Sequence, residues 1–334
     1  MAIVHADRPQ DATEDALQTL VGLVGADMGL VNGVITERMQ SPVGLIPLLA
    51  GHLIRSGGKR LRPMLTLASA RAFGYEGDKH LLLEFIHTAT LLHDDVVDES
   101  DLRRGAPAAH VVWGNQASVL VGDFLFSRAF RLMVETSNLR VLDILSNASA
   151  VIAEGEVMQL SAANDTTTTG ETYIKVIESK TAELFAAAAE VGAVIAGCNE
   201  TEIRAMRDYG LYLGMAFQLI DDALDYAGNA GDMGKETGDD FREGKITLPV
   251  VLAFERGNEM ERKFWKRTLE QGEQHAGDLT RATEFLTLHK AIPATIERAC
   301  AFGETARRAL AGLPKNPYTA ALGGIIDFCI ARAY

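Results

Sequence analysis

The sequence is poor in the residues that cross-link small extracellular folds or interrupt helices. Its cysteines are Cys198, Cys300 and Cys329, an odd number in which no pair has metal-ligand spacing. Neither a disulfide framework nor a zinc site is therefore indicated, and a reducing cytoplasm fits this composition. Only nine of the 334 residues are proline, and no Pro- or Ser-rich linker divides the chain. One large domain is the simplest interpretation.

The chain also lacks an excess of basic residues and a long apolar segment. Its 32 Lys and Arg residues against 45 Asp and Glu give a net charge of −13, which argues against nucleic-acid binding. Residues 1–10 contain no basic stretch followed by an apolar one, so we expect no signal peptide. No stretch reaches the roughly 18 apolar residues that cross a bilayer. We expect a cytoplasmic protein, soluble or peripheral, in which an anionic substrate needs its own local cations.

What the chain does contain is helical periodicity over nearly its whole length. Residues 181–197, rich in alanine and glycine, are expected to form a central, closely packed helix. No convincing alternating strand pattern is found, so the predicted fold class is all-α, a single bundle of about ten or more helices. Helices are predicted over residues 12–36, 43–56, 62–73, 79–101, 114–136, 139–162, 171–197, 200–227, 247–256, 258–270, 282–311 and 317–332.

Four connections between these helices stand out by composition. They cover residues 56–60, 100–109, 164–170 and 228–245. The last contains five glycines and charges of both signs. A connection longer than about 12–15 residues is usually a lid, a binding loop or disordered.

Two clusters of aspartates share the pattern D-D-x-x-D, and each follows an apolar helical run. Residues four apart lie on the same face of a helix, so Asp94 lies above Asp98 and Asp221 above Asp225. A single motif among 45 acidic residues would be explained by a solvated acidic face. Two copies on partly buried helices favour metal binding, because buried charges must be paired or bind metal. A divalent cation shared by the carboxylates would offset their repulsion.

Basic residues lie close to these motifs or in suitable loops. Any one of them is readily explained as a surface charge. Together with two acidic helices, they predict a site in which magnesium bridges carboxylates to phosphate oxygens while Arg and Lys bind the remaining negative charge. The candidates are Lys59, Arg62, Arg103, Arg104, Lys180, Lys235 and Lys245.

These motifs, in this order, resemble the trans-prenyl diphosphate synthases, the polyprenyl synthetase family, over roughly residues 40–333. The matching segments are Gly-Gly-Lys-x-x-Arg-Pro at 57–63, the acidic motif at 94–98 followed by Arg103-Arg104, Lys180-Thr181, the second acidic motif at 221–225, and a closing signature from Gly234-Lys235 to 244–249. One departure is Glu236, where many members have proline.

The resemblance implies an isoprenoid synthase fold around a central cavity, with a helical extension at residues 1–40 and a catalytic domain at 41–334. It implies two to three Mg²⁺ ions held by Asp94, Asp98 and Asp221. The other aspartates of the motifs, Asp95, Asp222 and Asp225, are further candidate metal ligands.

By the same resemblance, the substrates are isopentenyl diphosphate and an allylic prenyl diphosphate. Asp94, Asp98, Asp221, Lys180 and Arg103 would carry the catalysis. The residues implied for the allylic diphosphate are Arg103, Lys180, Thr181, Gln218, Lys235 and Lys245. Those implied for isopentenyl diphosphate are Lys59, Arg62, His87 and Arg104. Without the family, His87 would be interpreted as a satisfied helix histidine.

Ala89 and Thr90, five and four residues before Asp94, lie about one helical turn below the expected metal site. Members that stop at fifteen carbons have bulky aromatic residues there, so small residues predict an open tunnel and a product of eight to ten isoprene units. The floor of the tunnel would be set by other side chains, with Phe124, Phe126 and Phe130 as candidates. The family also implies a homodimer, a quinone side chain as end use, and peripheral membrane contact for product release.

Several alternatives remain at this point. A shorter, geranylgeranyl-type product is the nearest. A terpene cyclase would lack the Gly-Gly-Lys loop and the second aspartate cluster, and a non-catalytic partner subunit would have degraded aspartates. An HD-type metal phosphohydrolase could use His93-Asp94 with His52 and His87, but that hypothesis leaves Asp98 and the second cluster unexplained.

Overall fold

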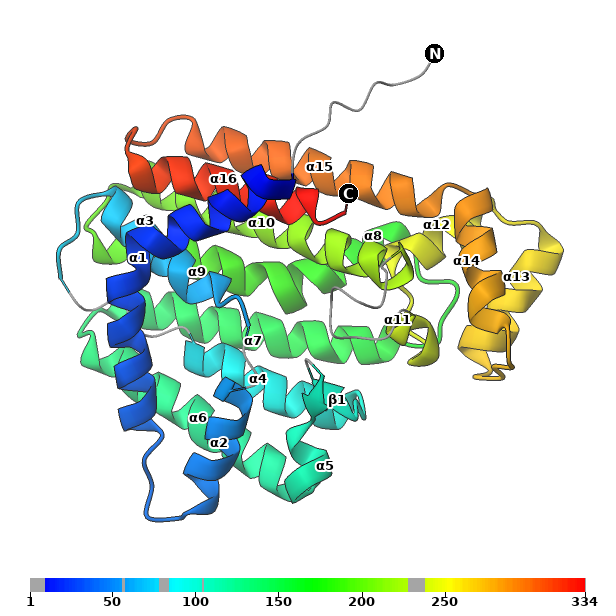
Figure 1. Cartoon of the computed structure of the whole chain (residues 1–334), viewed down its shortest axis with the longest axis horizontal. Helices are drawn as coiled ribbons and strands as arrows, with labels where there is room; N and C mark the ends of the chain where they lie inside the picture. The colour runs from blue at the N-terminus through cyan, green and yellow to red at the C-terminus, as the bar shows by residue number, and fades with distance from the viewer. Residues whose placement is uncertain (1–9, 56–57, 78–83, 104, 228–237, 334) are drawn as a thin grey trace.

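The computed structural model describes residues 10–55, 58–77, 84–103, 105–227 and 238–333, which are helical nearly throughout (Figure 1). The first half contains α1 (Gln10–Arg38), α2 (Leu45–Arg55), α3 (Leu61–Ala72), α4 (Glu84–Val97), α5 (Ala109–Trp113), α6 (Asn115–Glu135) and α7 (Leu139–Ala162). The second half contains α8 (Gly170–Ile177), η1 (Glu178–Ala182), α9 (Glu183–Ile195), α10 (Glu200–Ala227), α11 (Asp239–Arg242), α12 (Leu248–Arg256), α13 (Glu259–Trp265), η2 (Lys266–Glu270), α14 (Asp278–Leu288), α15 (Ala291–Leu310) and α16 (Pro317–Ala331). The all-α prediction is confirmed.

Helices α7 and α10 begin and end where the periodicity predicts. An asparagine fixes each start, because its side chain accepts hydrogen bonds from backbone amides that have no partner within the helix. Asn138 accepts from the amides of Arg140 and Val141. Asn199 accepts from those of Thr201 and Glu202 at 3.0 Å. The boundaries were therefore readable from local sequence.

Other predicted helices are interrupted. The segment predicted over 171–197 contains the π-helical turn η1, and the segment over 258–270 ends in the π-helical turn η2. The segment over 282–311 is two helices, because Lys290 adopts a left-handed conformation with φ 51° between α14 and α15. A positive φ is uncommon for a residue with a side chain and does not continue a helix.

Two short elements lie in segments that were predicted to be irregular. Strands β1 (Leu102–Arg103) and β2 (Ala106–Pro107) form a small antiparallel hairpin after α4. Helix α11 lies within the predicted connection 228–245. The expectation of no strand was therefore wrong over these few residues, which are too few to show an alternating pattern.

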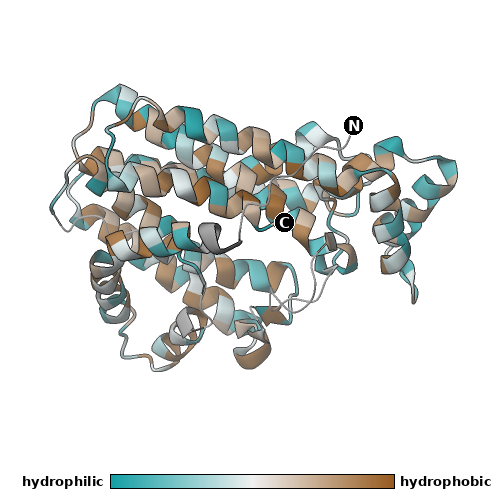
Figure 2. Ribbon diagram, turned by 45° about the horizontal axis from the view of Figure 1, so that its top comes forward, coloured by the Kyte–Doolittle hydropathy of each residue, from teal (hydrophilic) through white to brown (hydrophobic). Residues whose placement is uncertain are grey.

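The core forms around the Ala-rich helix α9, in which every residue from Glu183 to Val194 is buried. Glycines let the neighbouring helices approach it closely. A Cβ at Gly210 of α10 would lie 2.3 Å from the Phe185 carbonyl oxygen, and one at Gly192 would lie 2.5 Å from the Thr66 carbonyl oxygen of α3. The prediction of a central packed helix is confirmed. In Figure 2 most helices carry both hydrophilic and hydrophobic residues, as expected when one face packs on a core.

A second buried cluster lies among helices α12 to α15 at the right of Figure 1. It is built around Trp265, whose ring packs edge-on against Phe264 with centroids 5.3 Å apart. Phe285 contacts the same Phe264 ring at 5.2 Å. Aromatic contacts of this kind stabilise a small layer of short helices.

Helix α1 qualifies the expectation of no transmembrane segment. An 18-residue window within residues 15–38 has a mean hydropathy of 1.5, so by length and composition this helix could cross a membrane. In the structure, Leu20 and Val24 are fully buried in the main core, and Asp27 accepts hydrogen bonds from Arg71 of α3 at 2.7 and 2.9 Å. These are the contacts of a helix packed on a protein core.

Candidate active site

The first acidic motif lies at the C-terminal end of α4. Asp94 lies in its last turn, and Asp98 follows it directly, with its amide donating to the Asp94 carbonyl oxygen at 2.8 Å. The helical turn thus continues to Asp98 and places it one turn beyond Asp94, as the spacing predicts. Burial raises the pKa of Asp94 to about 7; Glu156 and Asp98 add to the shift, while Lys180 and Arg103 oppose it. Among the described residues, no side chain forms a hydrogen bond or ion pair with the Asp94 carboxylate. A partly buried carboxylate of this kind suits a site that receives a cation.

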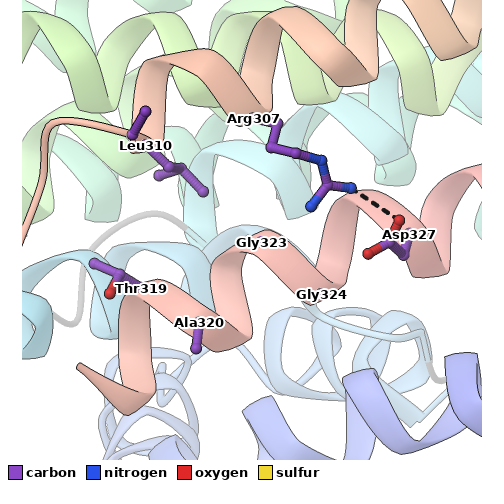
Figure 3. A pocket seen from close by; sticks show the side chains of 8 residues that line it. Arg307, Leu310, Thr319, Ala320, Gly323, Gly324 and Asp327 are labelled. Atoms are coloured by element: carbon purple, nitrogen blue, oxygen red, sulfur yellow. Dashed lines mark hydrogen bonds and ion pairs between the residues drawn. The ribbon is translucent and has the colours of Figure 1, made fainter. Parts of the chain in front are cut away.

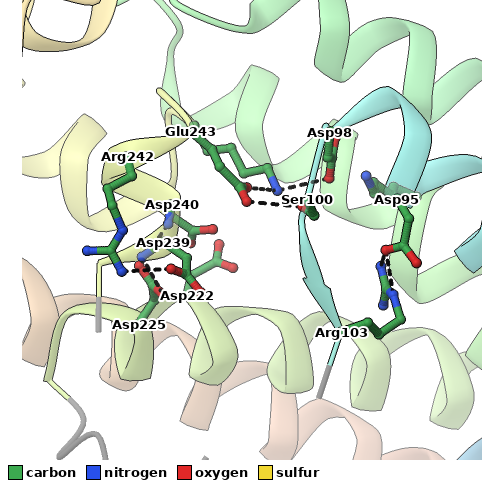
Figure 4. Close-up of polar contacts among 12 residues, drawn as sticks. Asp95, Asp98, Ser100, Arg103, Asp222, Asp225, Asp239, Asp240, Arg242 and Glu243 are labelled. Carbon is green, nitrogen blue, oxygen red and sulfur yellow. Dashed lines mark hydrogen bonds and ion pairs between the residues drawn. The ribbon is translucent and has the colours of Figure 1, made fainter. Parts of the chain in front are cut away.

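Asp95 is fully buried and is held by Arg103 at 2.5 Å from Oδ1. The β1–β2 hairpin turns the chain so that Arg103 points back to α4, as Figure 4 shows. The ion pair is tight because little water reaches it. Arg103 therefore anchors Asp95 in this state, and both were candidate site residues.

The second acidic motif lies near the end of α10, where its three aspartates have different partners. Asp221 Oδ1 forms an ion pair with Arg332, two residues from the chain end, at 2.6 Å. Asp222 is buried, and accepts hydrogen bonds from the Tyr173 hydroxyl and from Gln218 Nε2, the latter at 2.7 Å. Burial raises the pKa of Asp222 to about 6, although both hydrogen bonds lower it.

Asp225 caps helix α11. Its carboxylate accepts hydrogen bonds from the amides of Asp239 and Asp240 at 3.2 and 3.1 Å. Its carbonyl oxygen accepts from the amide of Gly238 at 2.8 Å. The first amides of a helix have no partner inside it, so a carboxylate placed there stabilises the helix start. Asp225 thus fixes the segment that follows the second motif.

Lys180 and Thr181 lie in the π-helical turn η1. Lys180 Nζ is 2.7 Å from Glu156 Oε2 of α7, and Thr181 donates to Gln218 Oε1 at 2.9 Å. Helix α7 approaches the turn closely at Gly155, where a Cβ would lie 2.7 Å from the Lys180 amide nitrogen. π-helical turns occur often at functional sites. The chain of hydrogen bonds from Thr181 through Gln218 to Asp222 links this turn to the second acidic motif.

A second group of candidate site residues comes from Lys59, just before α3, Arg62 on α3 and His87 on α4. Arg62 donates to His87 Nε2 at 3.0 Å, and its guanidinium lies 4.4 Å from the centroid of the Phe185 ring. Lys59 lies 4.6 Å from the centroid of the Phe328 ring on α16. Stacked guanidinium groups keep their planar donors oriented for phosphate. The structure therefore brings Arg62 and His87 into contact, whereas the binding role of Lys59, Arg62 and His87 stays a prediction.

Helix α11 and the residues after it connect the two acidic helices (Figure 4). Lys245 Nζ lies 3.0 Å from Asp98 Oδ2 and 2.6 Å from Glu243 Oε2. Burial lowers the pKa of Lys245, but Asp98, Asp240 and Glu243 raise it more, so the net pKa is raised. The ammonium group therefore stays charged between acidic side chains.

Within the described residues, no three Asp, Glu, His or Cys side chains converge on a point where they alone could hold a metal ion. The two motifs lie on separate helices, and three of their six carboxylates have a cation as partner. Magnesium keeps several water or phosphate oxygens among its ligands and often takes only one or two carboxylates from the protein. Asp94, with its neighbour Asp98, fits such a shared site.

Arg104 and Lys235 lie outside the described residues, as does Glu236 of the closing signature. Ala89 is fully buried, and the Thr90 hydroxyl donates to the His87 carbonyl oxygen at 2.9 Å. A groove of about 480 Å³ lies between α15 and α16, where Arg307 pairs with Asp327 at 2.8 Å (Figure 3). Since neither Ala89 nor Thr90 lines it, the tunnel stays a prediction.

Sequence reasoning missed several residues that contact the predicted site. They are Ser100, Glu156, Tyr173, Glu243 and Arg332. Each reaches a motif residue from a segment distant in the chain or from outside any motif, so local sequence carried no signal for it. Glu156 is the partial exception, because it is acidic on a helix with a largely apolar buried face.

The histidines do not support a phosphohydrolase. His93 Nε2 lies 3.4 Å from Asp123 and 3.2 Å from the Val119 carbonyl oxygen, both on α6. His52 Nε2 lies 2.9 Å from the Pro107 carbonyl oxygen, and His87 is bonded to Arg62. They have different neighbours, and in the described part of the chain no metal-binding group of three forms.

Comparisons with known proteins find relatives that match nearly the whole chain. Octaprenyl diphosphate synthase of Escherichia coli (strain K12) is 46% identical over 321 residues, which cover 95% of this chain and 99% of the relative. A crystal structure of a decaprenyl diphosphate synthase from Rhodobacter capsulatus is 52% identical with a TM-score of 0.92, covering 95% of this chain and 99% of that one.

A polyprenyl synthase from Caulobacter crescentus CB15, solved with calcium and isoprenyl diphosphate, is also 52% identical with a TM-score of 0.92. The alignment covers 95% of this chain and 98% of that one. The sequence profile of the polyprenyl synthetase family matches residues 45–286, well over half of the chain. The chain therefore belongs to the polyprenyl synthetase family.

Proposed function

We propose that this protein is a trans-polyprenyl diphosphate synthase that condenses isopentenyl diphosphate head-to-tail with an allylic diphosphate. The observation that carries the proposal is the arrangement of two aspartate motifs on α4 and α10, connected through α11 by Lys245 and Asp225. Two acidic helices surrounded by Arg and Lys suit a metal–diphosphate substrate and no neutral one.

Asp94, Asp98 and Asp221 would hold Mg²⁺, with two to three ions as the expected number. Bound Mg²⁺ neutralises the negative charge that grows on the leaving diphosphate. Asp98 and Asp221 are paired with Lys245 and Arg332, and each would exchange or share that contact with the metal. Asp95, Asp222 and Asp225 would act differently, since Arg103 holds Asp95, Tyr173 and Gln218 hold Asp222, and amides of α11 hold Asp225. We assign them to holding the two helices and α11 in place.

Lys180, Lys245, Arg103, Thr181 and Gln218 would bind the allylic diphosphate. Fixed positive charge at a leaving group stabilises the transition state without reorganisation during the reaction. Lys180 and Lys245 now contact Glu156 and Asp98, and each would exchange or share that contact with a phosphate oxygen. Lys235 is expected to join this group on the strength of the family resemblance.

Lys59, Arg62 and His87 would bind the diphosphate of isopentenyl diphosphate, together with Arg104. Its double bond attacks the allylic carbon as the C–O bond breaks, and a proton is then lost to the departing diphosphate. The carbocation needs surroundings that exclude water. The apolar side chains of α4, among them Ala89 and Leu92, which are fully buried, suit that requirement.

The product would be a long all-trans chain, because the residues below the first motif are small and the relatives include octaprenyl and decaprenyl diphosphate synthases. A quinone side chain is the proposed end use. We also propose a homodimer in the cytoplasm, membrane contact at product release, an extension at residues 1–40 and a catalytic domain at 41–334.

The test is incubation with labelled isopentenyl diphosphate, farnesyl diphosphate and Mg²⁺, followed by chromatography of the products. Elongation to about eight to ten isoprene units supports the proposal, and chelation of the metal should abolish it. Cyclised hydrocarbons or release of phosphate without elongation would contradict it. A product of four isoprene units would support the proposed prenyl transfer but contradict the proposed long product.

A further inference from the structure

Two residues without an assigned role connect the ends of the predicted site. Ser100 follows the first acidic motif, and Glu243 follows α11. Although 143 positions apart, they form a hydrogen bond in which Ser100 Oγ donates to Glu243 Oε1 at 3.2 Å (Figure 4). This contact joins the connection after α4 to the segment after α10.

Glu243 uses its other oxygen for Lys245. Oε2 lies 2.6 Å from Lys245 Nζ, and the same ammonium group lies 3.0 Å from Asp98 Oδ2. An ammonium group has three donors, so two carboxylates leave one donor for a further acceptor. The exposed fractions of the Lys245, Asp98 and Glu243 side chains are 24%, 21% and 29%, which leaves the cluster open to a ligand.

A lysine side chain is flexible, and fixing it costs conformational entropy at the moment of binding. A second carboxylate that holds the ammonium group beforehand removes part of this cost. Glu243 can do so because Ser100 fixes its position from the α4 side. Asp98 alone would not hold the Lys245 ammonium group in place, because Asp98 is an expected metal ligand and its carboxylate would then bind the metal.

The segment 238–245, which we call the α11 bridge, is therefore held at both ends. At its start, Asp225 accepts from the amides of Asp239 and Asp240. At its end, Glu243 is bound to Ser100. The α11 bridge therefore connects α10 to the end of α4 through hydrogen bonds between residues of the chain.

We propose that Glu243 is a positioning residue that, held by Ser100, aims the Lys245 ammonium group at the allylic diphosphate and keeps the α11 bridge against the end of α4. This inference rests on the proposed function. When the diphosphate enters, Lys245 exchanges Asp98 for a phosphate oxygen and keeps Glu243.

A double-mutant cycle tests the positioning role. Calorimetry would measure binding of inorganic pyrophosphate with Mg²⁺ to wild type, Glu243→Gln, Lys245→Met and the double variant. We expect Glu243→Gln to weaken binding about five- to tenfold, the size of a partly exposed charge-assisted contact. In the Lys245→Met background it should have no further effect, because its action passes through Lys245. An equal loss of pyrophosphate affinity in both backgrounds, or no loss of affinity at all, would contradict the positioning role of Glu243.

Steady-state kinetics separate positioning from general damage. Glu243→Gln should raise KM for the allylic diphosphate about five- to tenfold and leave KM for isopentenyl diphosphate within about twofold, since Lys59 and Arg62 bind the latter. Equal changes in both constants would contradict the inference. Glu259→Gln, which removes an exposed charge paired with Lys263, is the matched control and should match wild type.

Hydrogen exchange of the metal-free protein tests the contact with Ser100 independently of catalysis. The amide of Lys245, which donates to the Asp240 carbonyl oxygen at 2.8 Å, should exchange about tenfold faster in Ser100→Ala than in wild type. Unchanged exchange would show that Ser100 does not hold the bridge. If wild type fails to elongate prenyl diphosphates, the proposed function fails, whereas this measurement still decides whether the bridge exists.

Discussion

The six aspartates of the two motifs look equivalent in the sequence and are not equivalent in the structure. The spacing could predict that Asp94 and Asp98 share a helix face, because that follows from helix geometry alone. It could not predict that Asp222 is held by Tyr173, or Asp225 by the start of α11, since those partners lie 49 and 14–15 positions away. The distribution of roles is set by tertiary packing.

The first prediction compares a candidate metal ligand, Asp94, with Tyr173, whose hydroxyl donates to buried Asp222. Asp94→Asn should lower kcat by at least about a hundredfold, because it removes a candidate metal ligand. The metal-free variant should be as stable as wild type or more so, since a partly buried carboxylate without a partner among the described residues is removed. Tyr173→Phe should lower the free energy of unfolding by about 1–3 kcal/mol, because buried Asp222 loses a donor. Kinetics with urea unfolding of both variants would decide, and the reverse pattern would contradict these roles.

The second prediction concerns the pH dependence of stability. Hydrogen bonds from Arg267 hold the pKa of Asp278 below its usual 3.8, with burial opposing. A lowered folded-state pKa means that the stabilisation is complete above the unfolded-state value and is lost as pH falls through the folded-state value. Asp278→Asn should lower the free energy of unfolding by about 0.5–1 kcal/mol near neutral pH.

The difference in the free energy of unfolding between this variant and wild type should narrow below about pH 4, where the unfolded state begins to take up the proton. It should be lost once the pH has fallen through the lower folded-state pKa of Asp278. Urea denaturation across this range would measure it. Asp143→Asn, a change at an exposed position on α7, serves as the control. A difference that persists unchanged in acid would show that the Arg267 contact is not its source.

Among the helices, local signals predicted most boundaries and failed at specific interruptions. The starts of α7 and α10 were predictable because each capping asparagine, Asn138 or Asn199, directly precedes the apolar pattern of its helix. The turn η1 and the break at Lys290 were not, because an inserted π turn or one left-handed residue leaves the hydrophobic pattern nearly unchanged. The π turn matters most, since it carries Lys180 and Thr181.

The third prediction tests how closely α9 and α10 pack. Gly210→Ala should lower the free energy of unfolding by about 1–3 kcal/mol, because its Cβ would meet backbone atoms of Phe185 and Ala186 that cannot move alone. Gly29→Ala on α1 meets nothing within 4 Å and should instead add up to about 1 kcal/mol through helix propensity. Thermal unfolding of both variants would measure this, and equal effects would contradict the close approach.

For the molecule as a whole, the order of the motifs predicted the fold and the family, whereas the product length depends on how separate helices enclose a space. Ala89 on α4 and the pair Phe126–Phe130 on α6, whose ring centroids lie 5.2 Å apart, belong to facing helices. Sequence spacing gives the depth of Ala89 below Asp94 but not the side chains across from it. The length of the tunnel is therefore the property least readable from the sequence.

The fourth prediction concerns the length of the product tunnel. Ala89→Phe should shorten the main product by several isoprene units, because a phenyl ring one turn below the metal site would block the growing chain while leaving the diphosphate sites intact. The substitution also overpacks a buried position and should cost about 1–3 kcal/mol of stability. Ala306→Phe overpacks an equally buried alanine on α15, so it controls for instability and should keep the wild-type product lengths. Chromatography of radiolabelled products at equal enzyme activity would compare them, and an unchanged length distribution in Ala89→Phe would mean that the chain grows along another path through the bundle.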